Sequence, residues 1–389
     1  MKKKQNLVIL ANPFVNSKGF AGGDLYYIEL ANYLKKKYQV SIILPLFAKK
    51  HWPRKLKFLT LKRNPFDESE KRIFIFAAYL IRAYQSYRLL RNFPAKTIVC
   101  SSSDFFPDVL PVYFAKLRGK NFFWVSRFYH LVNLSNKNIN KLENLFSFAL
   151  QRISCYLAIK KSDLILVDNL NTLNFFKEKG IKEESLLLSG GSVDFKKLPR
   201  LKSDQERIYD AVFAGRLDYT KGIFDLPKIW SQVIKAIPSA KLAIAGTATL
   251  TNQRKLQNLI RMNGIEKNVR LFGFLPHKGK KTLFDVFAQS KIFLSLTLEG
   301  GRDFALIEAM AYGLPIIAYD QPFLREGTIN KGFLLAKKGD YIAVSKSIVH
   351  LLQNPKIRMK LAKLALKDIE NLDWKHTFNI LKDSFSALN

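Results

Sequence analysis

The chain has 389 residues, of which 48% are hydrophobic and 24% charged, a composition typical of a soluble globular protein. This length exceeds one ordinary hydrophobic core and predicts about two domains of roughly 150 to 200 residues. No apolar run approaches the ~18 to 20 residues of a membrane-spanning helix, and the apolar run 7–11 is too short for a secretory signal. Two cysteines, Cys100 and Cys155, offer neither a disulfide framework nor metal-ligand spacing, so we expect a cytoplasmic protein without a bound metal.

The net charge is extreme, because 64 Lys and Arg stand against 31 Asp and Glu and give +33. Such a charge attracts polyanions, among them nucleic acid, anionic lipid headgroups and diphosphate-linked substrates. A bias of the genome toward lysine is the alternative explanation. No nucleic-acid-binding module accompanies the charge, so we expect no nucleic-acid partner.

The first half of the chain alternates apolar runs with helical patterns. Strands are expected at residues 7–11, 39–44, 97–101, 122–126 and 164–168, and helices at 24–37, 108–117 and 142–159. This alternation indicates parallel βαβ units. The apolar helix 142–159 is expected in the core.

A polar stretch at residues 196–207 is expected to link two domains, one over 1–198 and one over 208–373. In the second, strands are expected at 210–214, 240–245, 269–272, 292–296, 315–318 and 332–335, and helices at 224–236, 251–262, 280–289, 305–311 and 341–352. Both halves therefore predict an α/β domain with a parallel sheet.

The most informative motif is a glycine-rich turn that follows the predicted strand 292–296 and precedes a helix. It reads Glu299-Gly300-Gly301-Arg302-Asp303-Phe304-Ala305, and Glu308 lies on the helix. Polar groups at such a turn can hold a diphosphate, and a carboxylate on the helix can accept hydrogen bonds from ribose hydroxyls. Ligands of open α/β sheets bind at the carboxyl ends of the strands, where this turn would lie.

Two further loops also follow predicted strands. Gly22 and Gly23 let the backbone approach a phosphate or a sugar, although a flexible turn explains a lone glycine pair equally well. Arg216 and Lys221 follow the first strand of the second domain and can converge on one diphosphate, whereas two solvated cations are the alternative.

Together these residues resemble the family-4 retaining glycosyltransferases of the GT-B fold. The segments that carry the resemblance are Gly22-Gly23, Gly191-Ser192-Val193-Asp194, Gly215-Arg216-Leu217 with Lys221-Gly222, and Glu299-Gly300 with Glu308 to Pro315. The resemblance implies two Rossmann-like domains that face each other across a cleft, with the nucleotide sugar on the second. It also implies that the C-terminal residues 374–389 return to the first domain, which binds the acceptor.

The resemblance implies roles for individual residues of the second domain. Arg216 and Lys221 would bind the diphosphate without a metal, and Glu308 would bind the ribose. Backbone groups of Phe272-Gly273-Phe274 would contact the nucleobase.

In the first domain, Gly23 would supply a backbone amide near the β-phosphate and the acceptor. His130 would touch the donor sugar, and a structural histidine is the alternative. Because eight residues separate Glu299 from Glu308 where family members usually have seven, Asp303 is the alternative to Glu299 as the catalytic carboxylate. The resemblance further implies retention of the anomeric configuration, and the donor is the only small molecule required.

Two segments point to a membrane surface. Residues 47–66 interleave seven cations with Phe47, Trp52 and Phe58, and residues 71–91 form an apolar stripe at helical spacing beside cations. Such patterns suit an anionic membrane, whereas a solvated loop and a helix packed on the sheet are the alternatives. We therefore expect a cytoplasmic protein, peripheral on the inner face of the membrane.

The combined reading is a retaining glycosyltransferase that moves a sugar from a nucleotide-diphosphate sugar to a lipid-linked or other glycan acceptor. Two alternatives remain at this point. One is a catalytically silent relative of the same fold that serves as a partner subunit, and the other is a basic polyanion-binding protein.

Overall fold

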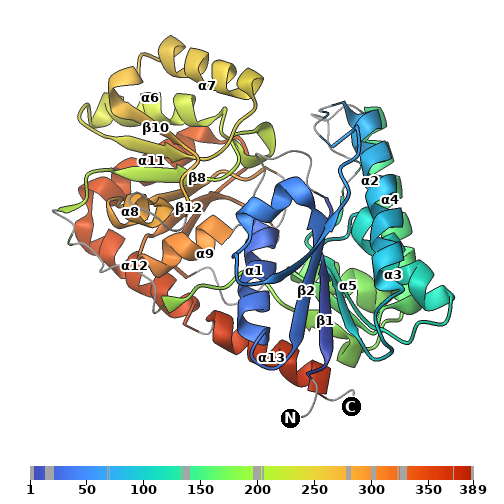
Figure 1. Cartoon of the computed structure of the whole chain (residues 1–389). Coiled ribbons are helices and arrows are strands. Elements are labelled where there is room, and N and C mark those ends of the chain that lie inside the picture. The colour runs from blue at the N-terminus through green and yellow to red at the C-terminus, as the bar shows by residue number, and fades with distance from the viewer. Residues whose placement is uncertain are drawn as a thin grey trace. The chain divides into compact units, whose positions relative to one another are not determined.

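The computed structural model describes residues 4–13, 22–67, 69, 71–132, 134, 141–195, 203, 206–276, 282–298, 304–321, 324, 331–370 and 372–386. The chain divides into two compact units (Figure 1). Unit 1 comprises Met1–Gly190 and Thr377–Asn389, and unit 2 comprises Gly191–His376. The two units are described separately below.

Unit 1 contains a seven-stranded parallel sheet with the order β3-β2-β1-β4-β5-β6-β7. Its strands are β1 (Asn6–Leu10), β2 (Gln39–Pro45), β3 (Lys57–Leu61), β4 (Ile98–Ser101), β5 (Phe123–Phe128), β6 (Leu164–Val167) and β7 (Leu186–Leu188). The central strands are continuous apolar runs because helices cover both faces of the sheet. The strand order reverses between β1 and β4, which makes that pair the topological switch point of the unit.

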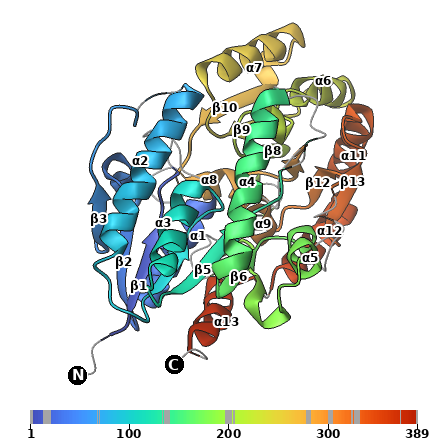
Figure 2. The same cartoon turned by 90° about the vertical axis from the view of Figure 1, so that its right-hand side faces the viewer.

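One face of this sheet is covered by α2 (Arg72–Leu90), α3 (Phe106–Leu117), α4 (Lys141–Lys161) and α5 (Leu170–Glu178), which share a core with the strands (Figure 2). The other face carries α1 (Gly22–Leu34) and α13 (Trp374–Ser386). The ring of Phe378 on α13 packs edge-on against Tyr26 on α1, with centroids 5.3 Å apart. The predicted return of the C-terminal helix to the first domain is therefore confirmed.

Unit 2 contains a six-stranded parallel sheet with the order β10-β9-β8-β11-β12-β13. Its strands are β8 (Ala211–Ala214), β9 (Leu242–Ala245), β10 (Val269–Gly273), β11 (Phe293–Ser295), β12 (Ile316–Tyr319) and β13 (Phe333–Ala336). Helices α6 (Leu226–Ala236), α7 (Leu250–Met262) and α11 (Tyr341–Gln353) pack on one face, and α8 (Leu283–Ala288), α9 (Phe304–Ala311) and α12 (Pro355–Asp368) on the other. Here the switch point lies between β8 and β11.

The structure differs from the sequence predictions in four elements. Strand β3 lies inside the basic segment 47–66, and strand β7 and helix α5 were not predicted. The prediction that helix 142–159 is core is half wrong, because α4 buries Cys155 and Ala158 but exposes Leu145 and Tyr156. A short strand inside a basic segment and an amphipathic helix rich in aromatics are both hard to assign by composition.

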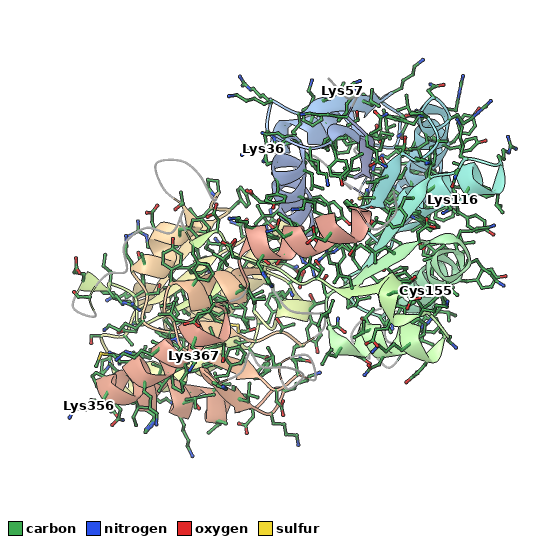
Figure 3. All side chains as sticks on the ribbon, turned by 90° about the horizontal axis from the view of Figure 1, so that it is seen from below. Lys36, Lys57, Lys116, Cys155, Lys356 and Lys367 are labelled. Atoms are coloured by element: carbon green, nitrogen blue, oxygen red, sulfur yellow. The ribbon has the colours of Figure 1, made fainter. Side chains whose placement is uncertain are left out.

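The positive charge is spread over both units. Figure 3 labels Lys36, Lys57 and Lys116 on unit 1 and Lys356 and Lys367 on unit 2. Among the helices of the described ranges, none combines the length and the apolar character that crossing a bilayer requires.

Candidate active site

In unit 2, the two loops predicted to bind the donor follow the two strands of the switch point. The loop with Arg216 and Lys221 follows β8, and the turn that begins at Glu299 follows β11. In parallel sheets the carboxyl ends of neighbouring strands meet at one edge, where ligands bind. The topology therefore places the starts of both loops at the carboxyl ends of β8 and β11, where ligands of such sheets bind.

These two loops are joined through the backbone. The amide of Leu298 donates a hydrogen bond to the carbonyl oxygen of Thr220, with an N–O distance of 2.8 Å. Gly222 has a φ of +67°, and a Cβ atom there would lie 2.0 Å from the carbonyl oxygen of Leu296. Only glycine tolerates both that conformation and that approach. The loop after β11 therefore holds the backbone in place at Gly222, directly after Lys221.

Arg216 projects from the loop after β8, and its side chain is 65% exposed. Its Nη1 atom lies 3.3 Å from Oδ2 of Asp218, and Nη2 donates weakly to Oγ1 of Thr220 at 3.5 Å. The guanidinium therefore lies beyond the carboxyl end of β8 and is accessible to an anion.

Lys221 ends the short 3-10 helix Tyr219–Lys221, whose N-cap is Asp218. The Oδ1 atom of Asp218 accepts hydrogen bonds from Oγ1 of Thr220 at 2.5 Å and from the amide of Lys221 at 3.3 Å. Asp218 thus contacts both cation-bearing parts of the loop. The sequence prediction did not include it, although its position three residues before Lys221 is an N-cap signal.

The predicted nucleobase segment ends β10, the edge strand of the sheet. The carbonyl oxygen of Gly273 accepts a hydrogen bond of 2.8 Å from Gly246, and Phe274 is exposed. The ring of Phe272 packs edge-on against Tyr209, with centroids 5.8 Å apart. Because β9 separates β10 from β8, this segment lies two strand spacings, about 10 Å, from the Arg216 loop.

Glu308 lies on α9 and is only 4% exposed. At the start of this helix, the ring of Phe304 stacks on Trp374 with centroids 6.1 Å apart, and a Cβ atom on Gly191 would lie 3.0 Å from that ring. Ala305 is half-buried on the same helix turn. The predicted residues Glu299, Gly300, Gly301, Arg302 and Asp303 lie outside the described residues.

In unit 1, Gly22 and Gly23 begin α1 beside the switch point of β1 and β4. A Cβ atom on Gly23 would lie 2.3 Å from the hydroxyl oxygen of Tyr129, so no side chain fits there. The hydroxyl of Tyr129 donates to the carbonyl oxygen of Ser102, which follows β4, at 2.8 Å. Tyr129 therefore packs against the start of α1 and joins it to the loops after β4 and β5.

His130 is exposed and follows β5 by two residues. Its carbonyl oxygen accepts a hydrogen bond of 2.7 Å from Nε2 of Gln151, which also donates to Oδ2 of Asp104 at 2.6 Å. Oε1 of Gln151 accepts from the amide of Val132 at 2.7 Å. Burial raises the pKa of Asp104, whereas the hydrogen bond from Gln151 and the attraction of His130 lower it. The His130 loop is thus clamped by α4.

A buried cation supports this part of unit 1. Arg127 is fully buried and forms an ion pair with Asp168. Its guanidinium carbon lies 3.8 Å from the ring centroid of Tyr26 and 4.8 Å from that of Tyr129. A buried charge needs such a partner, and breaking the pair is costly. This stack holds the ring of Tyr129, whose hydroxyl group packs against Gly23.

Residues 195–368, which lie in unit 2, match the family model described as glycosyl transferases group 1. This match to the glycosyl transferases group 1 covers most of unit 2 and less than half of the whole chain. A relative described as an uncharacterized glycosyltransferase of Methanocaldococcus jannaschii is 25% identical over 268 residues, which cover 66% of this chain and 63% of that protein.

A second relative, the GDP-mannose:cellobiosyl-diphosphopolyprenol alpha-mannosyltransferase of Xanthomonas campestris, is 24% identical over 178 residues, which cover 45% of this chain and 46% of that protein. The chain thus spans less than two thirds of the length of either relative. The structure of sucrose-phosphate synthase from Thermosynechococcus elongatus matches with a TM-score of 0.78 at 15% identity and covers 99% of each chain. That match shows the fold, and the predicted two-domain α/β GT-B architecture is confirmed.

Three residues of the candidate site in unit 1 were not predicted from the sequence. Tyr129, Asp104 and Gln151 come from distant segments and meet only when β4, β5 and α4 pack together. The structure describes four of the predicted site residues with ionisable side chains. Arg216, Lys221 and Glu308 lie in unit 2, and His130 lies in unit 1.

Proposed function

We propose that the protein is a retaining, metal-independent glycosyltransferase that uses a nucleotide-diphosphate sugar. The single observation that carries this proposal is the pair of loops at the switch point of unit 2, where the Arg216 and Lys221 loop is hydrogen-bonded to the loop that leads to Glu299. Two cations at the carboxyl edge of a parallel sheet suit a diphosphate. The group 1 match over the same unit supports this assignment.

In the proposed reaction, the bond between the anomeric carbon and the diphosphate oxygen breaks, and the acceptor oxygen bonds to the same face of that carbon. The proton of the acceptor hydroxyl passes to the departing diphosphate. Arg216 and Lys221 stabilise the negative charge that develops on the diphosphate, as preorganised donors do in other transferases. Glu308 binds the ribose hydroxyls, and the carboxylate of Glu299 or Asp303 lies beside the sugar.

We further propose that unit 1 binds the acceptor and that the amide of Gly23 and the side chain of His130 take part in its binding. Backbone amides at the start of a helix suit negative charge, which supports the role of Gly23. Asp104 lies near His130 and gives its imidazole an acidic neighbour.

The acceptor is proposed to be lipid-linked. Helices α2, α3 and α4 lie side by side on unit 1 (Figure 2), and their outer faces expose large apolar side chains, among them Ile73 at 73%, Tyr84 at 61% and Tyr156 at 57%. Among the side chains described on these helices, the one acidic residue is Asp108, which is buried. Exposed cations such as Arg88 and Lys160, with no exposed acid among the described side chains of these helices, suit an anionic membrane.

This surface differs from the predicted one in part. Trp52 in segment 47–66 is only 4% exposed, so its ring cannot insert into a membrane. Helix α4, which was predicted as core, adds Leu145, Phe146 and Ile153 to the apolar face. The Xanthomonas relative, whose name states a diphosphopolyprenol acceptor, supports the lipid-linked class.

A thermal-shift panel tests the donor assignment. UDP, GDP and ADP, each with and without a sugar, are added to the full chain, and the melting temperature is measured without added metal. Nucleotides of one base should raise the melting temperature, because a ligand that binds only the folded state stabilises that state. The absence of a shift with every nucleotide would overturn the proposal. Binding without transfer to any lipid-linked acceptor would favour the catalytically silent partner subunit.

A further inference from the structure

In the sequence, Asp218 lies between Arg216 and Lys221, the two cations that the proposed function assigns to the donor diphosphate. One of its carboxylate oxygens, Oδ2, lies 3.3 Å from Nη1 of Arg216. The other, Oδ1, caps the short helix by accepting from Oγ1 of Thr220 and from the amide of Lys221. A negative charge is therefore paired with Arg216 in a loop that is proposed to bind an anion.

The contacts of Arg216 show what a diphosphate must displace. A guanidinium grips a phosphate best through two parallel N–H groups. In Arg216, Nη1 faces Asp218 and Nη2 faces Thr220 at 3.5 Å, a length beyond that of a normal hydrogen bond. Because the side chain is 65% exposed, its rotation toward a ligand meets little packing. A two-pronged grip through Nη1 and Nη2 therefore requires Nη1 to leave Asp218.

The loop itself does not depend on that charge. Its backbone is fixed by the hydrogen bond from Leu298 to Thr220 and by the close approach of Gly222 to Leu296. The capping contacts use Oδ1 as an acceptor, which a neutral side chain such as Asn or Ser also supplies. The cap and the charge of Asp218 can therefore be separated by substitution.

We infer that Asp218 competes with the donor diphosphate for Arg216 and so weakens the binding of nucleoside diphosphates. In the ligand-free protein the carboxylate holds Arg216 at the sheet edge. When a diphosphate arrives, Arg216 exchanges partners, and the carboxylate repels the bound anion. This inference rests on the proposed function, because it assigns Arg216 to the diphosphate. Asp218 is a residue that sets affinity and promotes product release.

The test measures binding to the wild type, Asp218→Asn and Asp218→Ser. The probes are inorganic pyrophosphate, UDP, GDP and ADP, and the nucleoside of each base. Asp340→Asn is the matched control, because Asp340 also caps a helix of unit 2, accepting from the amide of Ala343 at 2.9 Å, and its substitution changes the net charge equally. Melting temperatures establish that each variant is folded.

Both Asp218 variants are expected to bind pyrophosphate and the responding diphosphate about three- to tenfold more tightly than the wild type. The affinity for the nucleoside and the affinities of Asp340→Asn should stay within about twofold. High salt should narrow the difference, because it screens exposed charges. If the wild type binds the probes and both folded Asp218 variants bind them equally or more weakly, the inference is wrong and the proposed function stands. If the wild type binds none of them, both fall together.

Discussion

The amide of Leu298 and the carbonyl oxygen of Thr220 are 2.8 Å apart and join the loops after β11 and β8. This bond couples the cations Arg216 and Lys221 to the turn that begins at Glu299. In a doubly wound sheet the two loops of the switch point are the natural ligand-binding pair. Here Leu298 also ties the start of the loop after β11 to the loop after β8, so the proposed donor site is built on connected backbone.

Arg216→Ala and Lys221→Ala should each weaken the binding of the responding nucleoside diphosphate by about 10- to 100-fold, because each removes a charge-assisted hydrogen bond. The free nucleoside should bind as before. Titration calorimetry measures both. Lys235→Ala is the control, since Lys235 is an exposed cation of the same unit on α6. Equal losses for the diphosphate and the nucleoside would show that these cations do not contact the diphosphate.

Gly23→Ala should destabilise unit 1, because the new methyl group would lie 2.3 Å from the hydroxyl oxygen of Tyr129. The expected loss is about 1 to 3 kcal/mol in the free energy of unfolding, as for other overpacked sites. Tyr129→Ala removes the obstacle, so the double variant should be more stable than the sum of the single effects predicts. Urea unfolding of the four proteins measures this coupling, and strict additivity would contradict the proposed contact.

The apolar face of α2, α3 and α4 should bring the protein to anionic vesicles. In liposome flotation, the wild type should float with vesicles rich in phosphatidylglycerol and much less with neutral ones. Ile73→Glu and Ile153→Glu should each reduce the floated fraction at least about threefold. Leu250→Glu is the control, because Leu250 on α7 of unit 2 is exposed to the same 73% as Ile73. Equal flotation of all variants would remove this surface from the account.

The stability of unit 1 should fall as the pH rises because of Asp108. Burial raises the pKa of this carboxyl group to about 7, against about 3.9 in the unfolded chain. Its contribution to stability is therefore complete below about pH 4 and is lost as the pH rises through 7. Between pH 5 and pH 8 the wild type should lose on the order of 2 to 3 kcal/mol more than Asp108→Asn in urea unfolding. Parallel pH profiles for the two proteins would contradict this.

Much of the fold was predictable because it rests on local pattern. The strands around β8 and β11 are short apolar runs, and the glycine at position 222 marks a turn that no other residue permits. The order of the motifs along the chain then predicted the GT-B architecture. Helix α4 was harder, because its exposed aromatics resemble core residues in composition and only packing shows which face is covered.

The position of the Arg216 and Lys221 loop was predictable, because both residues lie within six positions after a predicted strand. The role of Asp218 as the N-cap of the short helix in this loop was not predicted. Tyr129 against Gly23, and Gln151 beneath His130, are contacts between distant segments. They follow from the way parallel strands bring their carboxyl ends together, and no local pattern encodes which side chains then meet.

The central claim is that unit 2 binds a nucleoside diphosphate with Glu308 on its ribose. The most direct measurement compares the responding nucleoside diphosphate with its 2′,3′-dideoxy analogue, by titration calorimetry, on the wild type and Glu308→Gln, with Glu266→Gln as an exposed control. The wild type and the control should bind the natural nucleotide about tenfold or more tightly than the analogue, and a folded Glu308→Gln should lose that preference. A preference that survives in Glu308→Gln would contradict the account.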